Sequence, residues 1–556
     1  MRNKKDNLRI LVGVAGDTGL GKTSLLNALV GARREVLPSG NSGACTATVC
    51  LWEYNHDSHP ERSMRAEITF KLRDTLLDEL NDLVDELDEN PDSADDPETK
   101  AYRAQLSKQM AVFEKCSGLN YADGPTASEI LQAIEKKSGI YFRAENEPAN
   151  RGVRTIVSSE VVGFAKLLRP YIDSAYSGKK VEPVWPLVEQ VRIFMRAETL
   201  RHGLVLVDLP GEMDALEARS RIAKSFYNQL DKILIVTESI RAADNYTASQ
   251  LLSRNTFLEL EMDGLAQPQK MCIVVTKTDA MDWRAYCSEK EDTEDDRMAE
   301  VANIISQLDE MADEIESLQQ EVSELEEVIG VIGNGNATNG HSLSADQIEL
   351  LQLQNQLRQR LAARSTAEDQ AVGMCVAHRN EDIKMKILEM LNDNAKTYKA
   401  KGAQARNTDI GATDIFPVSS AAFRRLFQEP LPGFRDGPST GIPQLRKWLE
   451  QGTLEKRDAH ATELLNHCQN LMDYLRGWLL DDNTLVSLRA QLGDVDPNEV
   501  HKALKPHIIK LKKVREVPRT QDDAQSAYAD HLPAYSRNKV VVAIRHEESS
   551  GCESHW

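Results

Sequence analysis

The sequence predicts an α/β fold, with a mostly parallel sheet flanked by helices, helical insertions, and a C-terminal helical bundle or partial stalk. Three observations carry this prediction. Short apolar runs end in turns that contain glycine or aspartate, helical repeats of leucine lie between these runs, and a glycine-rich loop joins the first run to the first helix. Strands that alternate with helices favour a parallel sheet, because each crossover helix covers one face of the sheet.

The first apolar run, Leu8 to Val14, leads into a glycine-rich loop and then a helix with leucines at helical spacing. The loop fits the phosphate-binding pattern G-x-x-x-x-G-K-[ST] and consists of Gly16, Asp17, Thr18, Gly19, Leu20, Gly21, Lys22 and Thr23, followed by Ser24. Its amides and the positive end of the helix are expected to face phosphates. Lys22 should reach the β/γ oxygens, and Thr23 should offer a hydroxyl to Mg²⁺. The loop therefore predicts binding of a nucleoside triphosphate.

The identity of the base is predicted from another apolar strand, Met271 to Val275, which runs directly into Thr276-Lys277-Thr278-Asp279. This is the pattern [NT]-K-x-D. The Asp279 carboxylate can accept hydrogen bonds from both N1–H and the exocyclic amine of guanine, an edge that adenine does not present. The stem of Lys277 can lie along the base. The element favours guanine, so GTP and GDP are the expected ligands, with Thr276, Lys277 and Asp279 as nucleotide-binding residues.

A third buried strand, Leu204 to Val207, ends in Asp208-Leu209-Pro210-Gly211. This D-x-x-G pattern places Asp208 where it can hold Mg²⁺ through water. The backbone N–H of Gly211 can bond the γ-phosphate and so sense hydrolysis. The pattern therefore predicts that the nucleotide site responds to the presence of the γ-phosphate.

Two further loops complete the predicted site. A threonine after Leu37-Pro38-Ser39-Gly40 is expected to supply a second hydroxyl to Mg²⁺; Thr46 is the first candidate and Thr48 the alternative. Ser419 and Ser420 follow a short apolar segment and are expected to form the last guanine-side loop. The catalytic candidates are Lys22, Thr46, Gly211 and Thr18. The metal-ligand candidates are Thr23, Thr46 and Asp208.

In combination, these motifs resemble large GTPases of the dynamin superfamily, and most closely its SLIP-GC-like branch of nuclear GTPases. The resemblance rests on the G-D-T-G-x-G-K-[ST]-S loop, the Leu-Pro-Ser-Gly…Cys-Thr segment, the V-D-L-P-G strand end and the T-K-x-D element, and it covers Leu8 to about Trp448. It implies a P-loop GTPase domain followed by a helical stalk. It also implies that the GTPase domains associate with one another, as a homodimer or a higher assembly, and that this association promotes hydrolysis.

Two departures from the family bear on catalysis. Dynamins proper carry Gln-Ser in the P-loop, where this chain has Thr18 and Gly19. Small GTPases place a glutamine directly after D-x-x-G, where this chain has Glu212. GTP binding is therefore better supported than fast hydrolysis. The alternative to a dynamin-like GTPase is a GTP-gated binding or scaffold protein with little or no hydrolysis.

Composition limits the class of partner and compartment. The net charge of -20 argues against a large basic surface for nucleic acid. The eight cysteines form no C-x-x-C pair, which is typical of a reducing compartment. No stretch reaches the roughly 18 apolar residues of a membrane span. The sequence therefore predicts a soluble intracellular protein, in the nucleus or the cytoplasm.

The spacing of the motifs divides the chain. The predicted parts are residues 1–56 (N-terminal part of the GTPase domain), 57–184 (helical insertion), 185–290 (central part), 291–400 (helical hairpin or coiled-coil insertion), 401–452 (C-terminal part) and 453–556 (helical region, partial stalk). In the second insertion, apolar residues step by four and three from Ile304 to Ile329, and leucines repeat again from Leu350 to Leu361. This predicts an antiparallel hairpin, either packed only on itself or an arm for dimerisation or protein partners. A helix at Gln444 to Glu450 is expected to close the GTPase domain, with a separate helix after it.

Overall fold

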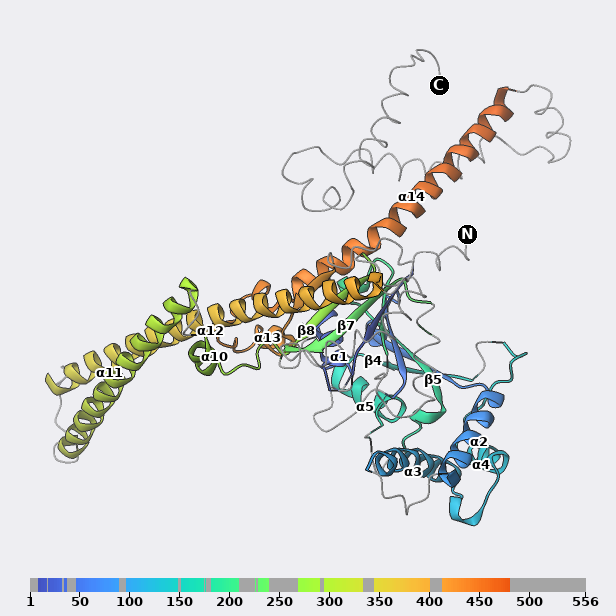
Figure 1. Cartoon of the computed structure of the whole chain (residues 1–556), viewed down its shortest axis with the longest axis horizontal. Helices are drawn as coiled ribbons and strands as arrows, with labels where there is room; N and C mark the ends of the chain where they lie inside the picture. Colours follow the sequence, from blue (N-terminus) through green and yellow to red (C-terminus); the bar gives the residue numbers. More distant parts are fainter. Residues whose placement is uncertain are drawn as a thin grey trace. The chain divides into compact units, whose positions relative to one another are not determined.

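A computed structural model describes residues 9–17, 19–32, 35–37, 47–89, 97–148, 152–174, 176, 182–209, 226, 229–239, 269–290, 295–333, 345–400 and 413–480. The chain divides into two compact units, Ile10–Leu449 and a second unit that comprises Glu450–Trp556 with Met1–Arg9. The first unit contains all of the described strands (Figure 1).

The strands are β1 (Ile10–Ala15), β2 (Val49–Tyr54), β3 (Met64–Phe70), β4 (Val153–Ser158), β5 (Val188–Met195), β6 (Leu204–Asp208), β7 (Lys232–Glu238), β8 (Met271–Thr276) and β9 (Asp414–Pro417). The helices are α1 (Lys22–Leu29), α2 (Arg73–Glu89), α3 (Pro97–Ser117), α4 (Ala127–Ser138), α5 (Val161–Ile172), α10 (Trp283–Glu289), α11 (Asp296–Gly333), α12 (Ala345–Ala400), α13 (Ser420–Arg425) and α14 (Ile442–Leu480).

Among the described residues, one nine-stranded sheet has the order β4-β3-β5-β2-β6-β1-β7-β8-β9. The five strands β6, β1, β7, β8 and β9 are parallel to one another. Strand β2 is antiparallel to β6 and parallel to β5, while β3 is antiparallel to both β4 and β5. The predicted α/β fold with a mostly parallel sheet is confirmed, and the antiparallel pairs all lie in the half of the sheet that begins at β2.

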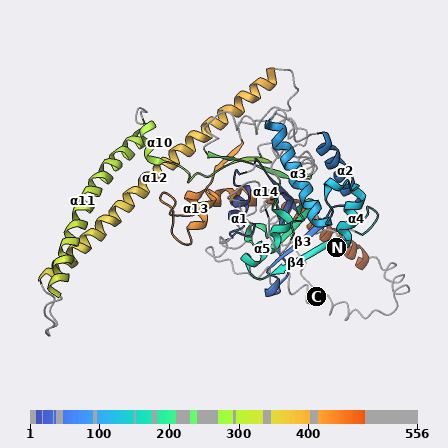
Figure 2. The same ribbon diagram turned by 90° about the horizontal axis from the view of Figure 1, so that it is seen from below.

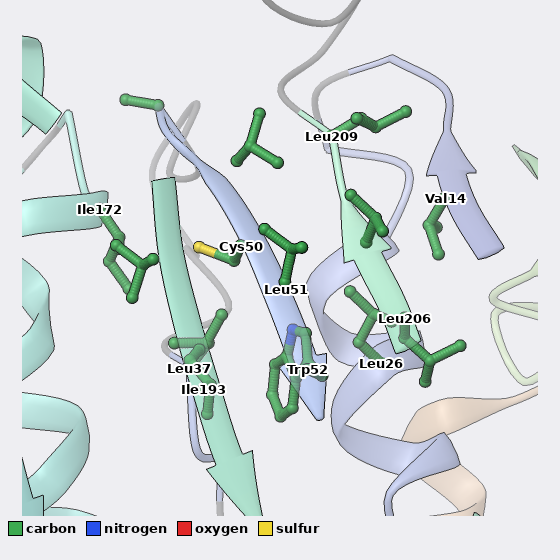
Figure 3. Packing of buried hydrophobic residues seen from close by; sticks show 14 of the residues in the cluster. Val14, Leu26, Leu37, Cys50, Leu51, Trp52, Ile172, Ile193, Leu206 and Leu209 are labelled. Atoms are coloured by element: carbon green, nitrogen blue, oxygen red, sulfur yellow. The ribbon is translucent and has the colours of Figure 1, made fainter. Parts of the chain in front are cut away.

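Strands in the parallel half of the sheet are buried on both faces. Every residue of β6 and of β8 is buried, so these strands read as continuous apolar runs rather than as alternating ones. Figure 3 shows how the core continues across the sheet, with Leu26 of α1, Trp52 of β2 and Ile193 of β5. Trp52 is fully buried. Burial of each such side chain contributes about 1.5–3 kcal/mol to the stability of the fold. The core therefore stabilises the sheet whose strand ends carry the candidate site.

The predicted helical insertion at residues 57–184 also contains two strands that the sequence analysis did not predict, because β3 and β4 lie within it and join the main sheet. The side chains of β3 alternate between buried and half-buried positions, as expected of a strand with one covered face. Arg192 of β5 connects the neighbouring strands, since its guanidinium lies 2.7 Å from Glu53 of β2 and 3.3 Å from Glu67 of β3. The sheet therefore resumes well before β5.

The remainder of that insertion is helical. In α2 the leucines Leu76, Leu80, Leu83 and Leu87 are buried on one face at intervals of three and four residues. Helix α4 begins with a capping box, in which the Thr126 hydroxyl and the Glu129 carboxylate each accept a hydrogen bond from the other residue's backbone N–H. These local signals explain why the helices form where the sequence predicts them.

The predicted hairpin in residues 291–400 is present. Helices α11 and α12 lie side by side in both Figure 1 and Figure 2. The apolar repeat of α11 forms the seam, with Ile304, Leu308, Ile315 and Val322 buried. The second helix is longer than predicted, because α12 continues beyond the leucine repeat to Ala400. The polar turn that the sequence places between the helices lies mostly outside the described residues.

Two expectations for the C-terminal part need correction. Gln444 to Glu450 and the apolar stripe after it do not form two helices, because α14 runs without a break from Ile442 to Leu480. The compact units divide between Leu449 and Glu450, three residues before the predicted boundary. The residues beyond Leu480 lie outside the described residues. In the parts of the chain that the structure describes, no helix is both long enough and apolar enough to cross a membrane.

Candidate nucleotide-binding site

The elements of the candidate site, four of them predicted from the sequence, lie at the carboxyl ends of five adjacent parallel strands. The glycine-rich loop follows β1, Asp208 ends β6 and Glu238 ends β7, while Asp279 comes after β8 and Ser419 after β9. Carboxyl ends of parallel strands meet at one edge of a sheet, where open α/β folds bind their ligands. The topology thus brings together segments that are up to 400 residues apart in sequence.

The backbone of the glycine-rich loop requires its glycines. Gly16, Gly19 and Gly21 have φ angles of 142°, 86° and 89°, in the region that other residues rarely adopt. A Cβ atom on Gly16 would also lie 2.5 Å from the carbonyl oxygen of Val236, which is backbone and cannot move aside. Gly21 is the N-cap residue of α1, and no side chain makes a capping hydrogen bond there. The helix N-terminus therefore carries no side-chain cap, which suits a site that is predicted to bind phosphate.

Lys22 is held at this loop. Its side chain is buried, and its ammonium group donates hydrogen bonds to the carbonyl oxygens of Gly16 (2.6 Å) and Asp17 (2.9 Å). The ammonium group therefore lies against the loop whose amides are predicted to receive the phosphates.

Thr23 and Asp208 meet across the end of β1. The Thr23 hydroxyl donates a hydrogen bond to the Asp208 carboxylate at 3.1 Å, and Asp208 is fully buried. A hydroxyl and a carboxylate are hard oxygen ligands, and Mg²⁺ in nucleotide sites takes one or two such protein ligands together with phosphates and water. The donor set therefore fits Mg²⁺. Burial, and then the charge of Asp208, raise the pKa of the neighbouring Cys50 thiol well above its ordinary value, which keeps this thiol protonated.

The predicted base-recognition loop has an unusual backbone. Lys277 has a φ of 57°, in the left-handed region, and among the described residues no other non-glycine residue has a positive φ. The Thr276 hydroxyl lies 2.6 Å from the Leu20 carbonyl oxygen and 3.0 Å from that of Thr237, so it ties the base loop to the phosphate loop. The Ser239 hydroxyl donates to the Lys277 carbonyl at 2.9 Å.

The side chains of this loop are positioned by neighbouring strand ends. The Lys277 ammonium group pairs with Glu238 at 2.6 Å. The Ser419 hydroxyl donates to Asp279 Oδ1 at 2.5 Å and accepts a hydrogen bond from the Ala422 amide at 2.9 Å. Ser419 thus caps α13 and orients the Asp279 carboxylate at the same time. Because a carboxylate has about four acceptor positions, Asp279 can still receive both guanine donors.

Comparison with known proteins agrees with this geometry. Residues 12–279 match the dynamin family, over a segment that contains the phosphate loop, Asp208 and the base loop. The chain carries a dynamin-family domain. The match supports a GTP-binding, dynamin-like protein.

The dynamin-like chain is similar to two curated proteins, both named nuclear GTPase SLIP-GC. It is 24% identical to the mouse protein over 292 residues and 24% identical to the human protein over 294 residues. Each match covers 50% of this chain and 34% of the relative, so the chain spans about a third of the length of these relatives.

Solved structures of an oligomerised bacterial dynamin pair, described in connection with long-range sensing and tethering of membranes, are also similar. One chain is 14% identical with a TM-score of 0.41, and the match covers 99% of this protein and 54% of that chain. Another is 15% identical with a TM-score of 0.37, and the match covers 98% of this protein and 62% of that chain.

Several predicted site residues of the dynamin-like domain have other surroundings or are not described. Thr18, Thr46 and Gly211 lie outside the described residues. Thr48, the alternative to Thr46, is buried and donates its hydroxyl hydrogen to the Tyr171 carbonyl at 3.0 Å. That bond ties the hydroxyl hydrogen of Thr48 to the backbone of α5.

The remaining predicted residues belong to the elements that hold the site. Leu20 is buried and offers its backbone carbonyl to Thr276. Ser24 is half-buried in the first turn of α1. Ser420 begins α13 and is buried, so its hydroxyl faces protein rather than solvent. Leu20 thus contributes its backbone carbonyl to the site, whereas Ser419 contributes a side chain to it.

Sequence reasoning missed three residues that contact the base loop, namely Glu238, Ser239 and Arg379. Glu238 and Ser239 follow the apolar run Ile233 to Val236, which carries the same signal of a buried strand ending in polar residues. That signal could have identified them. Arg379 lies on α12, about 100 residues after the loop, and nothing local in the sequence connects the two.

Proposed function

We propose that this dynamin-like protein binds GTP with Mg²⁺ and hydrolyses it to GDP and phosphate. We further propose that this cycle is coupled to rearrangement of its helical parts and to self-association through the GTPase domains. The observation that supports the proposal is the meeting of Lys22, the Thr23–Asp208 pair and the Ser419–Asp279 pair at one edge of the sheet.

In the proposed mechanism the phosphates lie on the loop amides and on the N-terminus of α1. Thr23, Thr46 and, through water, Asp208 would hold Mg²⁺, which supplies positive charge next to the phosphates. Lys22 and the loop amides would neutralise the charge that develops on the β–γ bridge while water attacks the γ-phosphate in line. The Gly211 amide would bond the γ-phosphate and release its loop after hydrolysis.

The proposed guanine recognition follows from the base loop. Asp279 would accept the N1–H and the exocyclic amine of guanine, and the stem of Lys277 would lie along the base. Ser419 and Ser420 would close the other side of the base. Support comes from the hydrogen bond that aims the Asp279 carboxylate and from the bonds of Thr276 that tie this loop to the phosphate loop.

A second candidate is a GTP-gated binding or scaffold protein with little hydrolysis, in which bound GTP sets the state of the helical arms. The sequence supports it at three positions, because Thr18, Gly19 and Glu212 replace the groups that position water in related GTPases. A lone site without such groups is slow, and a charge-stabilising group supplied by a second molecule is worth about 10³ to 10⁵ in rate.

The two candidates are separated by GTP turnover measured over a hundredfold range of protein concentration, with light scattering in parallel. For a dynamin-like GTPase we expect turnover per molecule to rise with concentration, and GDP with aluminium fluoride to promote dimers. The Lys22→Ala variant serves as the control for contaminating activity. A flat specific activity from a protein that stays monomeric would refute the dependence of hydrolysis on self-association and favour the scaffold.

A further inference from the structure

Helix α12 of the second insertion contacts the base-recognition loop through one side chain. The Arg379 guanidinium donates hydrogen bonds to the carbonyl oxygens of Thr278 (2.6 Å) and Ala280 (3.2 Å). These two carbonyls flank Asp279 on either side in the chain. Because the guanidinium group is planar and rigid, one side chain holds both peptide groups in a defined relation.

The base loop depends on such support because its conformation is strained at Lys277. Its other bonds come from nearby strand ends or from within the loop. The Lys277 carbonyl receives the hydrogen of Ser239, and the Asp279 carbonyl receives the amide of Met281 at 3.1 Å. Arg379 donates to the other two carbonyls in this stretch, those of Thr278 and Ala280. Two of the four carbonyls from position 277 to position 280 are therefore held by a helix outside the parallel strands.

The same segment of α12 also packs against α13, the helix that Ser419 caps. Val376, one turn before Arg379, forms a small buried cluster with Ala422 of α13 and with Phe434. The amide of Ala422 donates to the Ser419 hydroxyl, which in turn donates to Asp279. Helix α12 thus borders both the backbone of Asp279 and the serine that orients its side chain.

Polar contacts hold the segment of α12 around Arg379 against its neighbours. The Asp369 carboxylate pairs with Arg435 at 2.6 Å and accepts the amide of Gly433 at 2.8 Å. On the other side, His378 lies 3.1 Å from Asp295. The Asp369–Arg435 ion pair and the His378–Asp295 contact, on two sides of the helix, fix its rotation about its axis, which keeps the Arg379 side chain directed at the base loop.

Apolar packing adds to these charged contacts. Cys375 is buried with Met298 and Val301 of α11 and with Cys287 of α10. A displacement of the hairpin would therefore move the Arg379 side chain together with the helix that carries it, since a packed core transmits small shifts rather than absorbing them.

We propose that Arg379 is a positioning residue for guanine recognition and that α12 of the helical hairpin sets nucleotide affinity through it. The inference rests on the proposed function of GTP binding. Coupling between two sites is reciprocal, so bound nucleotide should also stabilise the packing of α12 against the base loop. From the start of α12 to Arg379 the helix extends over roughly 50 Å, at 1.5 Å per residue, so an event near the hairpin turn can reach the base loop along one rigid element.

The test compares Arg379→Ala and Arg379→Lys with Arg358→Ala, a matched variant because Arg358 is an exposed arginine on the same helix. The first readout is the release rate of a fluorescent GDP. The second is the affinity ratio of GTP to ITP, which lacks the exocyclic amine that Asp279 is proposed to bind. For Arg379→Ala we expect GDP release about tenfold faster, equivalent to about 1.4 kcal/mol, and a smaller GTP/ITP ratio. Arg379→Lys should be intermediate and Arg358→Ala unchanged.

The ratio is decisive because a general folding defect weakens GTP and ITP equally, whereas a misplaced Asp279 weakens GTP more. If Arg379→Ala folds poorly, hydrogen exchange of the wild-type chain with and without GDP decides instead. Added protection of residues 369–382 supports the coupling, and unchanged exchange there overturns it. Normal GTP binding with wild-type release rates and an unchanged ratio in Arg379→Ala overturns the inference alone. Absence of GTP binding by the wild-type chain overturns the proposed function as well.

Discussion

Replacement of Asp279 by asparagine tests the base assignment most directly. The carboxylate is proposed to accept two hydrogen bonds from guanine, while its Oδ1 atom is held by the Ser419 hydroxyl. In Asp279→Asn that hydroxyl favours the amide oxygen as its acceptor, because the serine oxygen already accepts the Ala422 amide and its hydrogen remains to be donated. The amide NH₂ is then turned toward the base. The NH₂ group cannot accept hydrogen bonds from the two donors of guanine, but it can donate one to the C2 oxygen of xanthine.

The expected magnitude follows from these contacts. A hydrogen bond to a charged acceptor contributes about 1.5–3 kcal/mol, so loss of two such bonds costs about 3–6 kcal/mol. At about 1.4 kcal/mol per tenfold change, GTP affinity should fall by roughly two to four orders of magnitude. Xanthosine triphosphate should bind Asp279→Asn more tightly than it binds the wild-type protein.

The assay is a competition titration of GTP, XTP and ATP against a fluorescent nucleotide. The double variant Ser419→Ala/Asp279→Asn is the structural control, because without the serine the amide is no longer oriented and part of the gain for XTP should disappear. Equal affinity of the wild-type protein for ATP and GTP would refute the base assignment. An XTP gain that is identical in the single and double variants would refute the role of Ser419.

The remaining predictions concern the phosphate side, the link between the loops and the base of the hairpin. Lys22→Ala should abolish detectable binding of both GTP and GDP in the same titration, because it removes the buried ammonium group at the loop. Thr46→Ala should keep GDP affinity nearly intact while single-turnover hydrolysis falls; a loss of GDP affinity would contradict its switch role. Thr276→Val removes a buried hydroxyl between two carbonyls and should destabilise the domain by about 1–3 kcal/mol, seen as a lower melting temperature. Hydrogen bonds from Arg297 lower the pKa of Asp295 from 3.8 to about 2, so its stabilising effect is complete above pH 3.8 and is lost as the pH falls through about 2. Asp295→Asn should therefore show a shallower loss of melting temperature than the wild type between about pH 5 and pH 2.

The site was largely predictable because its signals are local. A buried strand, a glycine loop and a helix start occur within 20 residues at the phosphate loop, and the same strand-then-polar pattern marks Asp208 and Asp279. The hairpin was predictable for a similar reason, since one periodicity runs through α11. Each of these patterns records which face of a single element is buried, and that information is present in the sequence around the element.

Only the tertiary structure placed β4 in the sheet and Arg379 on the base loop. Strand β4 is the last strand on its side of the sheet, and its side chains are half-buried or exposed, so it has no apolar pattern to identify it. Arg379 acts through backbone carbonyls, which every residue possesses. The residue types of α12 and of the base loop therefore do not reveal that the two segments are in contact. The sequence alone therefore determined the chemistry of each strand end. The tertiary structure decided which distant side chains hold those ends in position, because such contacts depend on the packing of whole elements rather than on the pattern within one.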